Sequence, residues 1–221
     1  PYYVEWASAY DPAVAHIGGS AHALDMIRSG GYGTDMDQFF NSAAYWRTSD
    51  RSAPHNVYTD FDHLDAMRES KGKTASSFTA FPRINEEKAS SPPTTAIDID
   101  VSTGTFHVSY DYDSSCNCYI RKQGGDNHLD REGGQISPKV VIALKVSMGL
   151  VFEDGYRESI TTTGSGAAFV FQNGMAIEAT WSRDSDKSRL TLLGSDGKEL
   201  SLVRGQTWIT ALGDDREVSW R

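Results

Sequence analysis

The chain has 221 residues, of which 38% are hydrophobic, and its formal net charge is −9 at pH 7. This length and composition allow one large domain or two small ones with apolar cores. The acidic balance argues against a generic nucleic-acid partner, because phosphates attract a basic surface. No stretch reaches the roughly 18 apolar residues that cross a bilayer, so we expect no membrane-spanning segment in these residues.

The first part of the chain carries the signals of a strand, a glycine turn and a helix. Residues 13–17 (Ala-Val-Ala-His-Ile) predict a buried strand that runs into a turn at Gly18-Gly19. Ser20 can cap a helix over residues 21–29, which the Gly30-Gly31 pair would end. In this order the three elements predict a piece of an α/β layer.

A second helix is predicted from Thr59 to Gly72. The Thr59 hydroxyl can cap its first turn, with Asp62 at the third helical position of a capping box. The apolar face of this helix would consist of Phe61, Leu64 and Met67. The acidic cluster of Asp60, Asp62 and Asp65, beside His63, fits the positive end of the helix dipole, because no calcium-loop glycine and glutamate follow it. We therefore expect no metal site.

The chain changes character at residues 89–95, which read Ala-Ser-Ser-Pro-Pro-Thr-Thr. Two prolines among small residues cannot continue a helix and are typical of a linker. We therefore expect an α/β N-terminal domain over residues 1–89, a linker over residues 90–95 and a second domain over residues 96–221.

After this linker, hydrophobic residues recur with the period of β-strands, beginning with Ile97, Ile99 and Val101. Further strands are predicted at residues 106–112, 140–146, 158–163, 167–172, 176–181, 190–193, 199–203 and 207–212. Asn173-Gly174 and Asp196-Gly197 have the spacing of hairpin turns. The sequence thus predicts an α+β protein, in which an α/β N-terminal remnant precedes a mostly antiparallel, β-rich C-terminal domain.

Residues 51–59 (Arg-Ser-Ala-Pro-His-Asn-Val-Tyr-Thr) combine the polar side chains of Arg51, His55, Asn56 and Tyr58 with a proline-stiffened turn. Pro54 restricts its own backbone and that of Ala53, so Arg51 and His55 are presented on a rigid connection. Arg51 can pair with a carboxylate or phosphate, and His55 can accept a proton near neutral pH. In the structural alternative, Arg51 forms an internal ion pair, Asn56 closes a turn and His55 bonds to backbone. The sequence leaves both interpretations open.

The segment from His16 to Ser20 also allows two interpretations. A glycine turn that leads into a helix offers free N–H groups and a positive dipole end, and so could cradle an anion. Alternatively, Ser20 caps the helix and the glycines only supply a tight turn. The segment lacks the lysine of a nucleotide-binding loop, so no nucleotide, and no other cofactor, is expected.

The two cysteines, Cys116 and Cys118, are separated by one residue. A bridge between them would close a very small, strained ring, so we expect no mutual disulfide and place both thiols in or beside an exposed hairpin.

Three segments resemble one known family: His16 to Ser20, Tyr45-Trp46-Arg47 and the run from Arg51 to Thr59. They are similar to the YerB-like family, bacterial proteins described as lipoproteins, whose biochemical activity is uncharacterised. The resemblance implies an extracytoplasmic protein, anchored to the membrane through a segment before Pro1, with the start of its first domain missing. The ligand-binding candidates are His16, Arg47, Arg51, His55, Asn56 and Tyr58.

A second stretch, Tyr119-Ile120-Arg121 followed by His128-Leu129-Asp130, resembles another motif of the same family. In that motif a strand carries the arginine and the next loop carries the histidine and aspartate, with a hairpin turn signal at Gly124-Gly125 between them. Arg121, His128 and Asp130 form the second candidate cluster. His128 and Asp130 act as a catalytic dyad in one interpretation and pack the turn in the other.

Two functions therefore compete. The leading hypothesis is a non-enzymatic binding or scaffolding protein of the cell envelope, whose ligand, an envelope polymer or protein, is bound near residues 51–58. The rival is a hydrolase of cell-wall material, with His55 as base and Arg51 orienting the substrate. An exposed His55 beside Arg51 and an unpaired carboxylate would favour the enzyme, whereas a buried His55 bonded to backbone would favour the scaffold.

Overall fold

The computed structural model describes residues 1–132, 134–150 and 158–221. The chain divides into two units: the first comprises Pro1–Thr79 and Ser185–Arg189, and the second comprises Ala80–Asp184 and Leu190–Arg221. Helices occur in the first unit and antiparallel sheets dominate the second, which confirms the α+β fold class. Within the described residues, no helix is both long and apolar enough to cross a membrane.

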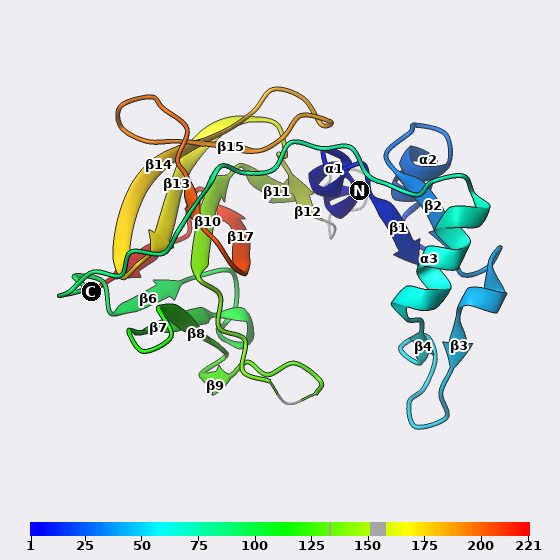
Figure 1. Cartoon of the computed structure of the whole chain (residues 1–221), viewed down its shortest axis with the longest axis horizontal. Coiled ribbons are helices and arrows are strands. Elements are labelled where there is room, and N and C mark those ends of the chain that lie inside the picture. Colours follow the sequence, from blue (N-terminus) through cyan, green and yellow to red (C-terminus); the bar gives the residue numbers. More distant parts are fainter. Residues whose placement is uncertain (133, 151–157) are drawn as a thin grey trace. The chain divides into compact units, whose positions relative to one another are not determined.

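The first unit contains three helices and four short strands (Figure 1). These are α1 (Tyr2–Ser8), β1 (Ala13–His16), α2 (Ala21–Arg28), β2 (Thr34–Asp37), η1 (Ser42–Ala44, a 3₁₀ turn), β3 (Trp46–Arg47), β4 (Val57–Tyr58) and α3 (Phe61–Ser70). Strands β1 and β2 run parallel, with His16 opposite Asp37 at their carboxyl ends, and α2 connects them. The predicted strand, turn and helix are therefore present as an α/β layer.

Helix α2 is capped as the sequence predicts, because the Ser20 hydroxyl accepts a hydrogen bond from the Ala23 N–H at 3.2 Å. Its buried residues Met26 and Ile27 pack with Val4 of α1 and with the half-buried Val14. The expectation that residues 13–17 form a fully buried strand is wrong. Alternate residues of β1 are exposed because β1 pairs with a single strand and buries one face only.

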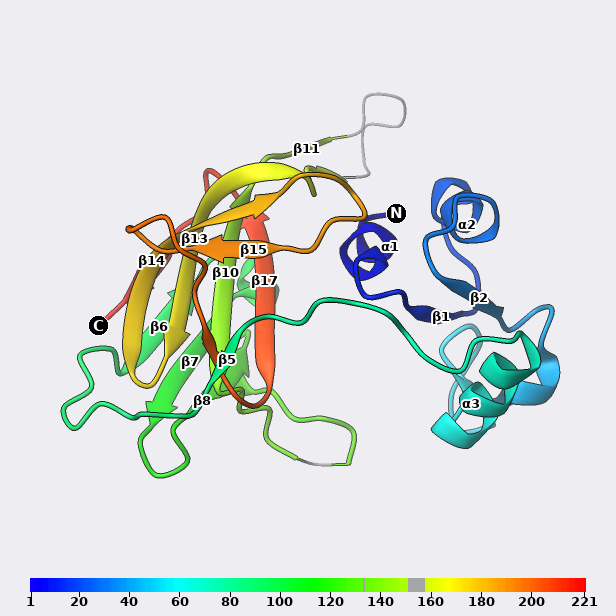
Figure 2. The same ribbon diagram turned by 45° about the horizontal axis from the view of Figure 1, so that its top comes forward.

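Helix α3 begins one residue later than predicted. Asp60 is its N-cap and accepts the His63 N–H at 2.9 Å, whereas the Thr59 hydroxyl donates to the Ala44 carbonyl at 2.7 Å. Met67 is buried against Met36, as expected for the apolar face, but Phe61 is 83% exposed. Figure 2 shows β1 and β2 between α2 and α3.

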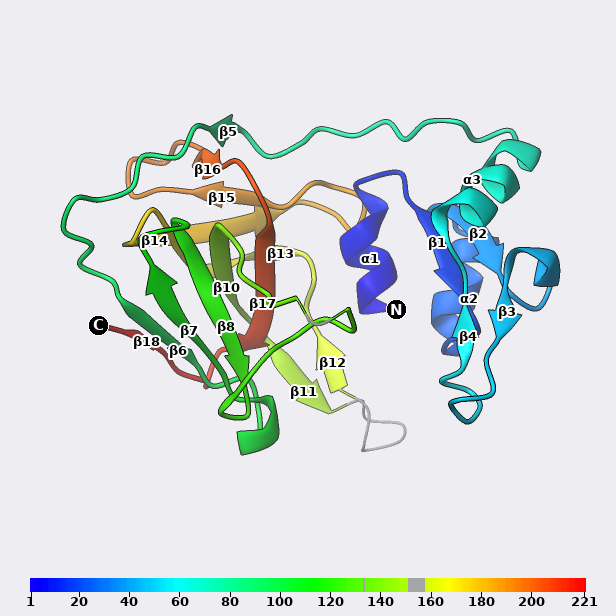
Figure 3. The same cartoon turned by 60° about the horizontal axis from the view of Figure 1, so that its bottom comes forward.

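The second unit contains two five-stranded sheets (Figure 3). The first sheet has the order β18 (Val218–Trp220), β6 (Ala96–Ile99), β7 (Val108–Asp113), β8 (Cys118–Gln123) and β9 (Asp126–Asn127). The second has the order β15 (Thr191–Leu193), β14 (Met175–Arg183), β13 (Gly164–Gln172), β10 (Val140–Val146) and β17 (Thr207–Gly213). The remaining elements are β5 (Arg83–Ile84), η2 (Gly104–Phe106), β11 (Met148–Leu150), β12 (Glu158–Ile160) and β16 (Leu202–Val203).

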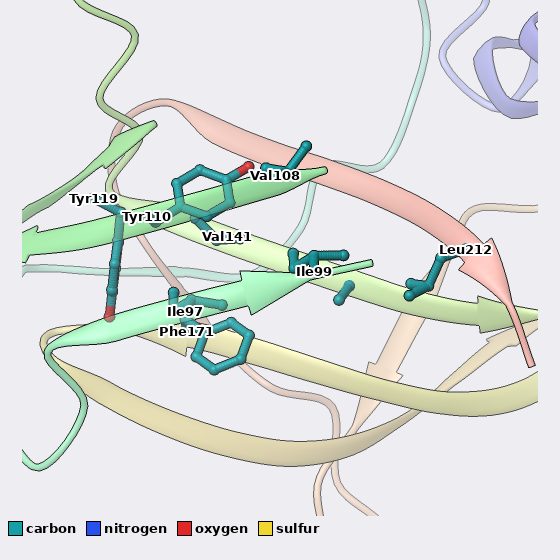
Figure 4. Close-up of a cluster of buried hydrophobic side chains, with 9 residues drawn as sticks. Ile97, Ile99, Val108, Tyr110, Tyr119, Val141, Phe171 and Leu212 are labelled. Carbon is teal, nitrogen blue, oxygen red and sulfur yellow. The ribbon is translucent and has the colours of Figure 1, made fainter. Parts of the chain in front are cut away.

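The apolar core of the second unit lies between its two sheets (Figure 4). Ile97, Ile99 and Tyr110 of the first sheet meet Val141 and Phe171 of the second. Alternating residues thus face inward from both sheets, which is the packing of a β-sandwich. The predicted hairpin turn at residues 173–174 is present between β13 and β14, and both residues have positive φ.

The structural division of the chain falls at Thr79–Ala80, before the expected linker at residues 90–95. Strand β5 already pairs with β16 of the second unit. The Ala89 N–H donates to the Asn173 carbonyl at 3.1 Å, and the Thr94 N–H donates to the Gly174 carbonyl at 3.1 Å. These bonds tie the proline-rich segment to the β13–β14 turn.

Cys116 and Cys118 form a disulfide, so the expectation of two unbridged thiols is wrong. That expectation rested on the strain of so small a ring, but Cys116 lies in the β7–β8 turn and only Cys118 belongs to a strand. Between them Asn117 has a φ of +51°, which folds the backbone back. The two Cα atoms are consequently 5.2 Å apart, within the usual range for a disulfide.

Candidate functional site

The polar run predicted from residue 51 forms the loop of the β3–β4 hairpin. The Arg47 guanidinium donates to the Asn56 Oδ1 at 2.7 Å, and the Asn56 amide donates to the Thr48 carbonyl at 2.9 Å. Arg51 donates to the Tyr58 hydroxyl at 3.4 Å. The structure therefore brings together Arg47 with Asn56 and Arg51 with Tyr58, on one exposed two-stranded ribbon.

Both arginines of this hairpin carry a charge without an ion pair. Among the residues that the structure describes, no carboxylate lies within 4.0 Å of the Arg47 or Arg51 guanidinium. The hydrogen bond to Tyr58 raises the pKa of Arg51, and the charge of Asp50 acts in the same direction. The hairpin thus offers two permanent positive charges to solvent.

His55 is exposed at the tip of the hairpin, after the cis Ala53–Pro54 peptide bond. Its backbone N–H donates to the Ser52 carbonyl at 3.1 Å. Within the described part of the chain, its ring has no recorded hydrogen bond, and no carboxylate holds the ring in one orientation. The structure therefore shows the accessible His55 of the enzyme hypothesis without the third group that orients a catalytic base.

His16 lies at the carboxyl end of β1, and its hydrogen bonds join it to Asp35 and Gly18 rather than to the β3–β4 hairpin. Its Nε2 is 2.9 Å from Asp35 Oδ1, and its Nδ1 accepts the Gly18 N–H at 3.3 Å. Since Nδ1 accepts, the hydrogen-bond network assigns the proton to Nε2. Sequence reasoning placed His16 in a ligand site but did not find its partner on β2.

Asp37 is the buried member of this cluster. Its side chain is 1% exposed, accepts the Phe39 N–H at 2.9 Å and pairs with the Arg28 guanidinium at 2.5 Å. Burial acts to raise the pKa of Asp37, but the Phe39 N–H, the Arg28 hydrogen bond and the His16 and Arg28 charges together hold it below its ordinary value. The alternation in residues 34–37 (Thr-Asp-Met-Asp) was the signal that could have revealed this strand.

The ligand atoms of His16, Asp35 and Asp37 lie within 4.8 Å of one another, close enough to hold one metal ion. Arg28 already pairs with Asp37 and has its Nε 3.7 Å from Asp35 Oδ2. Because the oxygens of Asp37 are both engaged, a cation would have to displace existing bonds. The arrangement is chemically complete as a histidine, carboxylate and guanidinium network.

In the second unit, the structure joins two of the three residues of the Arg121 cluster. Arg121 is 4% exposed, and its Nη1 donates to Gln123 Oε1 at 3.2 Å and to His128 Nδ1. Asp130 instead accepts the Gly134 N–H at 2.9 Å. His128 therefore pairs with Arg121, and among the described residues no hydrogen bond joins His128 to Asp130.

Aromatic and amide groups support this pair. The Arg121 guanidinium carbon lies 4.4 Å from the Trp208 ring centroid, a cation–π contact. The Gln135 amide donates to the carbonyls of Arg121 at 2.8 Å and His128 at 3.2 Å. Burial and, secondly, the Arg121 charge lower the pKa of His128, which favours the neutral imidazole whose Nδ1 accepts from Arg121. Gln123, Gln135 and Trp208 were not identified from the sequence.

Comparisons with known proteins match both units. A family model described as "Protein of unknown function (DUF3048) N-terminal domain" covers residues 1–75, and the corresponding C-terminal domain model covers residues 97–209. The chain is 28% identical over 220 residues to "Putative lipoprotein YerB" of Bacillus subtilis. The aligned region covers 96% of this chain but only 64% of that protein's length. The crystal structure of the B. subtilis YerB protein matches with a TM-score of 0.80 at 26% identity, over 99% of this chain and 74% of that one.

Proposed function

Since the chain belongs to the DUF3048 family of proteins of unknown function, we propose that it is an extracytoplasmic binding protein of the cell envelope. Its ligand is an anionic envelope component, bearing carboxylates or phosphates, which contacts the β3–β4 hairpin. His55 and Tyr58 flank the charged groups on the same hairpin and contribute polar contacts.

One observation carries this proposal. Arg47 and Arg51 each donate to a neutral oxygen and have no ion-pair partner among the described residues, although the chain as a whole is acidic. A guanidinium binds a carboxylate or phosphate through paired N–H groups, and the hydrogen bonds to Asn56 and Tyr58 preorganise both side chains. An anionic ligand would complete the charge pairing.

Two further observations support an extracytoplasmic location. The similar B. subtilis protein is named as a lipoprotein, a class that is attached to the outer face of a membrane. Disulfides persist mainly in oxidising compartments, and Cys116 and Cys118 form one.

The direct test measures binding of the whole chain to polygalacturonate, which carries carboxylates, and to inorganic polyphosphate, which carries phosphates. The double variant Arg47→Ala with Arg51→Ala should bind at least about tenfold more weakly, since each charged hydrogen bond contributes about 1.5–3 kcal/mol. His55→Ala should weaken binding while leaving the melting temperature nearly unchanged, because the ring is exposed.

Arg204→Ala is the matched control, since it removes one exposed positive charge from the second unit. It should retain the affinity of the wild type. Equal weakening by Arg204→Ala would show that net charge, and not the hairpin, determines the binding. Failure of both polymers to bind the wild type would overturn the proposal. A drop of several degrees in the melting temperature of His55→Ala with binding intact would make His55 a folding residue.

A further inference from the structure

A second candidate site lies in the β-sandwich unit, where an open hollow of about 560 Å³ is bounded by η2 and the β8–β9 turn. This volume is within the range of small-ligand sites. The lining combines glycine backbone with a hydroxyl, two amides, a carboxylate and an imidazole. Its polar side chains belong to Thr105, Gln123, Asp126, Asn127 and His128.

Arg121 determines which atoms of this lining remain available. A guanidinium can only donate, so the two atoms that it contacts, Gln123 Oε1 and His128 Nδ1, must act as acceptors. The Gln123 amide N–H groups and the His128 Nε2–H therefore remain as donors. Gln135 holds the backbone of both Arg121 and His128, which keeps this geometry in place.

Arg121 is a buried charged residue behind the lining of the hollow. Arg121 is only 4% exposed, and its Nε has no hydrogen-bond partner among the described residues. Burying a charged group costs free energy unless it is hydrogen-bonded, and Arg121 meets this cost through its bonds to Gln123 and His128 and its contact with Trp208. Here it fixes the orientation of two side chains that line a hollow.

The hydrogen-bonding groups of the lining separate hydroxyl ligands from anionic ligands. Asp126 is exposed and is the only ionised side chain in the lining. An ionised carboxylate or phosphate has no proton to donate to Asp126, whereas a hydroxyl can accept from Gln123 or His128 and also donate to Asp126. Adjacent hydroxyls of a sugar ring satisfy both kinds of group at once.

We propose that this hollow binds a neutral saccharide, with Gln123 and His128 donating to ring hydroxyls and the Asp126 carboxylate accepting from them. Arg121 acts as a positioning residue behind Gln123 and His128. This site belongs to the second unit and the β3–β4 hairpin to the first, and the two take ligands of different charge.

The test titrates the whole chain with three neutral tetrasaccharides, namely cellotetraose, maltotetraose and tetra-N-acetylchitotetraose, and with anionic tetragalacturonate, by calorimetry. At least one neutral probe should bind, and Asp126→Ala should weaken it about tenfold or more, because hydrogen bonds to a charged group are the stronger ones. Asp214→Ala, which removes an exposed carboxylate from the β17–β18 turn, should leave the affinity unchanged.

The role of Arg121 is tested through His128, which avoids disturbing the buried cation. His128→Gln keeps an acceptor for Arg121 and a donor for the sugar, and should retain most of the affinity, whereas His128→Ala should lose it. The double variant of Arg47 and Arg51 should bind the neutral probe as the wild type does, which separates this site from the hairpin.

Three results would overturn the proposal. These are tighter binding of tetragalacturonate than of every neutral probe, unchanged affinity in Asp126→Ala, and no binding of any neutral probe up to about 10 mM, a concentration at which even a millimolar Kd would register. Loss of affinity in Asp214→Ala to the same extent would equally reject Asp126 as a specific contact.

Discussion

Asn117 donates a hydrogen bond from its side-chain amide to the Asn173 Oδ1 at 3.0 Å, joining the tips of two hairpins that belong to different sheets. Both asparagines have left-handed backbone conformations, with φ of +51° and +57°. Asn117 is 4% exposed, and it also accepts from the Tyr112 hydroxyl at 2.8 Å and donates to Glu86 at 2.9 Å. One side chain thus connects β7, the segment before β6 and the β13–β14 turn.

We expect Asn117→Ala to destabilise the second unit by about 1–3 kcal/mol through unsatisfied buried partners, with a further loss from the positive φ. Asn117→Gly should be less harmful than Asn117→Ala, because glycine adopts positive φ without strain. Urea unfolding measures both. A glycine variant that is less stable than the alanine variant would show that the backbone conformation is not what limits this turn.

The Cys116–Cys118 disulfide gives a chemical prediction. Without a reductant, iodoacetamide should modify neither cysteine of the folded or unfolded chain, and after reduction it should modify both. The intact mass should be two hydrogens below that of the reduced form. Mass spectrometry of the protein purified under oxidising conditions reads this directly, and a fully alkylated unreduced chain would contradict the bridge.

The Arg121–His128 pair predicts a pH dependence of stability. Burial and the Arg121 charge lower the pKa of His128 in the folded chain, whereas the unfolded value is about 6.5. Below that pH the unfolded chain binds more protons than the folded one, so the free energy of unfolding should fall as pH drops from about 6.5 through the folded pKa. At a pH well above about 6.5 this group should have no effect on stability.

The variant for this test is His128→Gln, which can still accept from Arg121 but does not titrate. Its urea midpoint should decline less than that of the wild type between pH 7.5 and pH 5, as followed by tryptophan fluorescence. Parallel curves for the two proteins would show that His128 does not contribute.

Asp37 should stabilise the first unit. Asp37→Ala leaves the Phe39 N–H and the Arg28 guanidinium without their acceptor, and we expect a loss of about 1–3 kcal/mol. Asp37→Asn keeps the shape but loses the charge, and should fall between the wild type and Asp37→Ala. Because the folded pKa of Asp37 is lowered, the advantage of the wild type over Asp37→Asn should be present above about pH 3.8 and shrink as pH falls through the folded pKa.

Limited proteolysis tests where the chain divides. Residues 71–80 are exposed and carry no helix or strand, whereas residues 90–95 are tied by hydrogen bonds to the β13–β14 turn. We therefore expect the first cuts between α3 and β5, after Lys71 or Lys73 with trypsin. First cuts at residues 90–95 with a nonspecific protease would instead favour the proline-rich segment as the joint.

Much of the local structure could be predicted from sequence because its signals are short-range. The Ser20 cap with its glycine turn and the Asn173-Gly174 hairpin depend on neighbouring residues, and both are present. The predictions of a Thr59 cap and of Phe61 in the apolar face failed for a tertiary reason, since the Thr59 hydroxyl donates to the Ala44 carbonyl and Phe61 is left 83% exposed. Short helix ends are decided by such distant partners.

The candidate sites show the same boundary between local and distant causes. The hairpin residues Arg47 to Tyr58 are close in sequence, so their grouping could be predicted, and Arg121 and His128 are brought together by one short turn. The partners of His16 on β2, and Trp208 against Arg121, come from strands whose pairing the sequence does not specify.

By itself the sequence determined the α+β class, the polar run around Pro54 and the order of most strands, because hydrophobic period, glycine turns and caps act over a few residues. Only the tertiary structure decided that Cys116 and Cys118 are bridged, that Asp37 is a buried ion-pair partner and that Arg121 orients the lining of a hollow. These features depend on backbone folding and burial, which bring distant groups together and change what each charge costs.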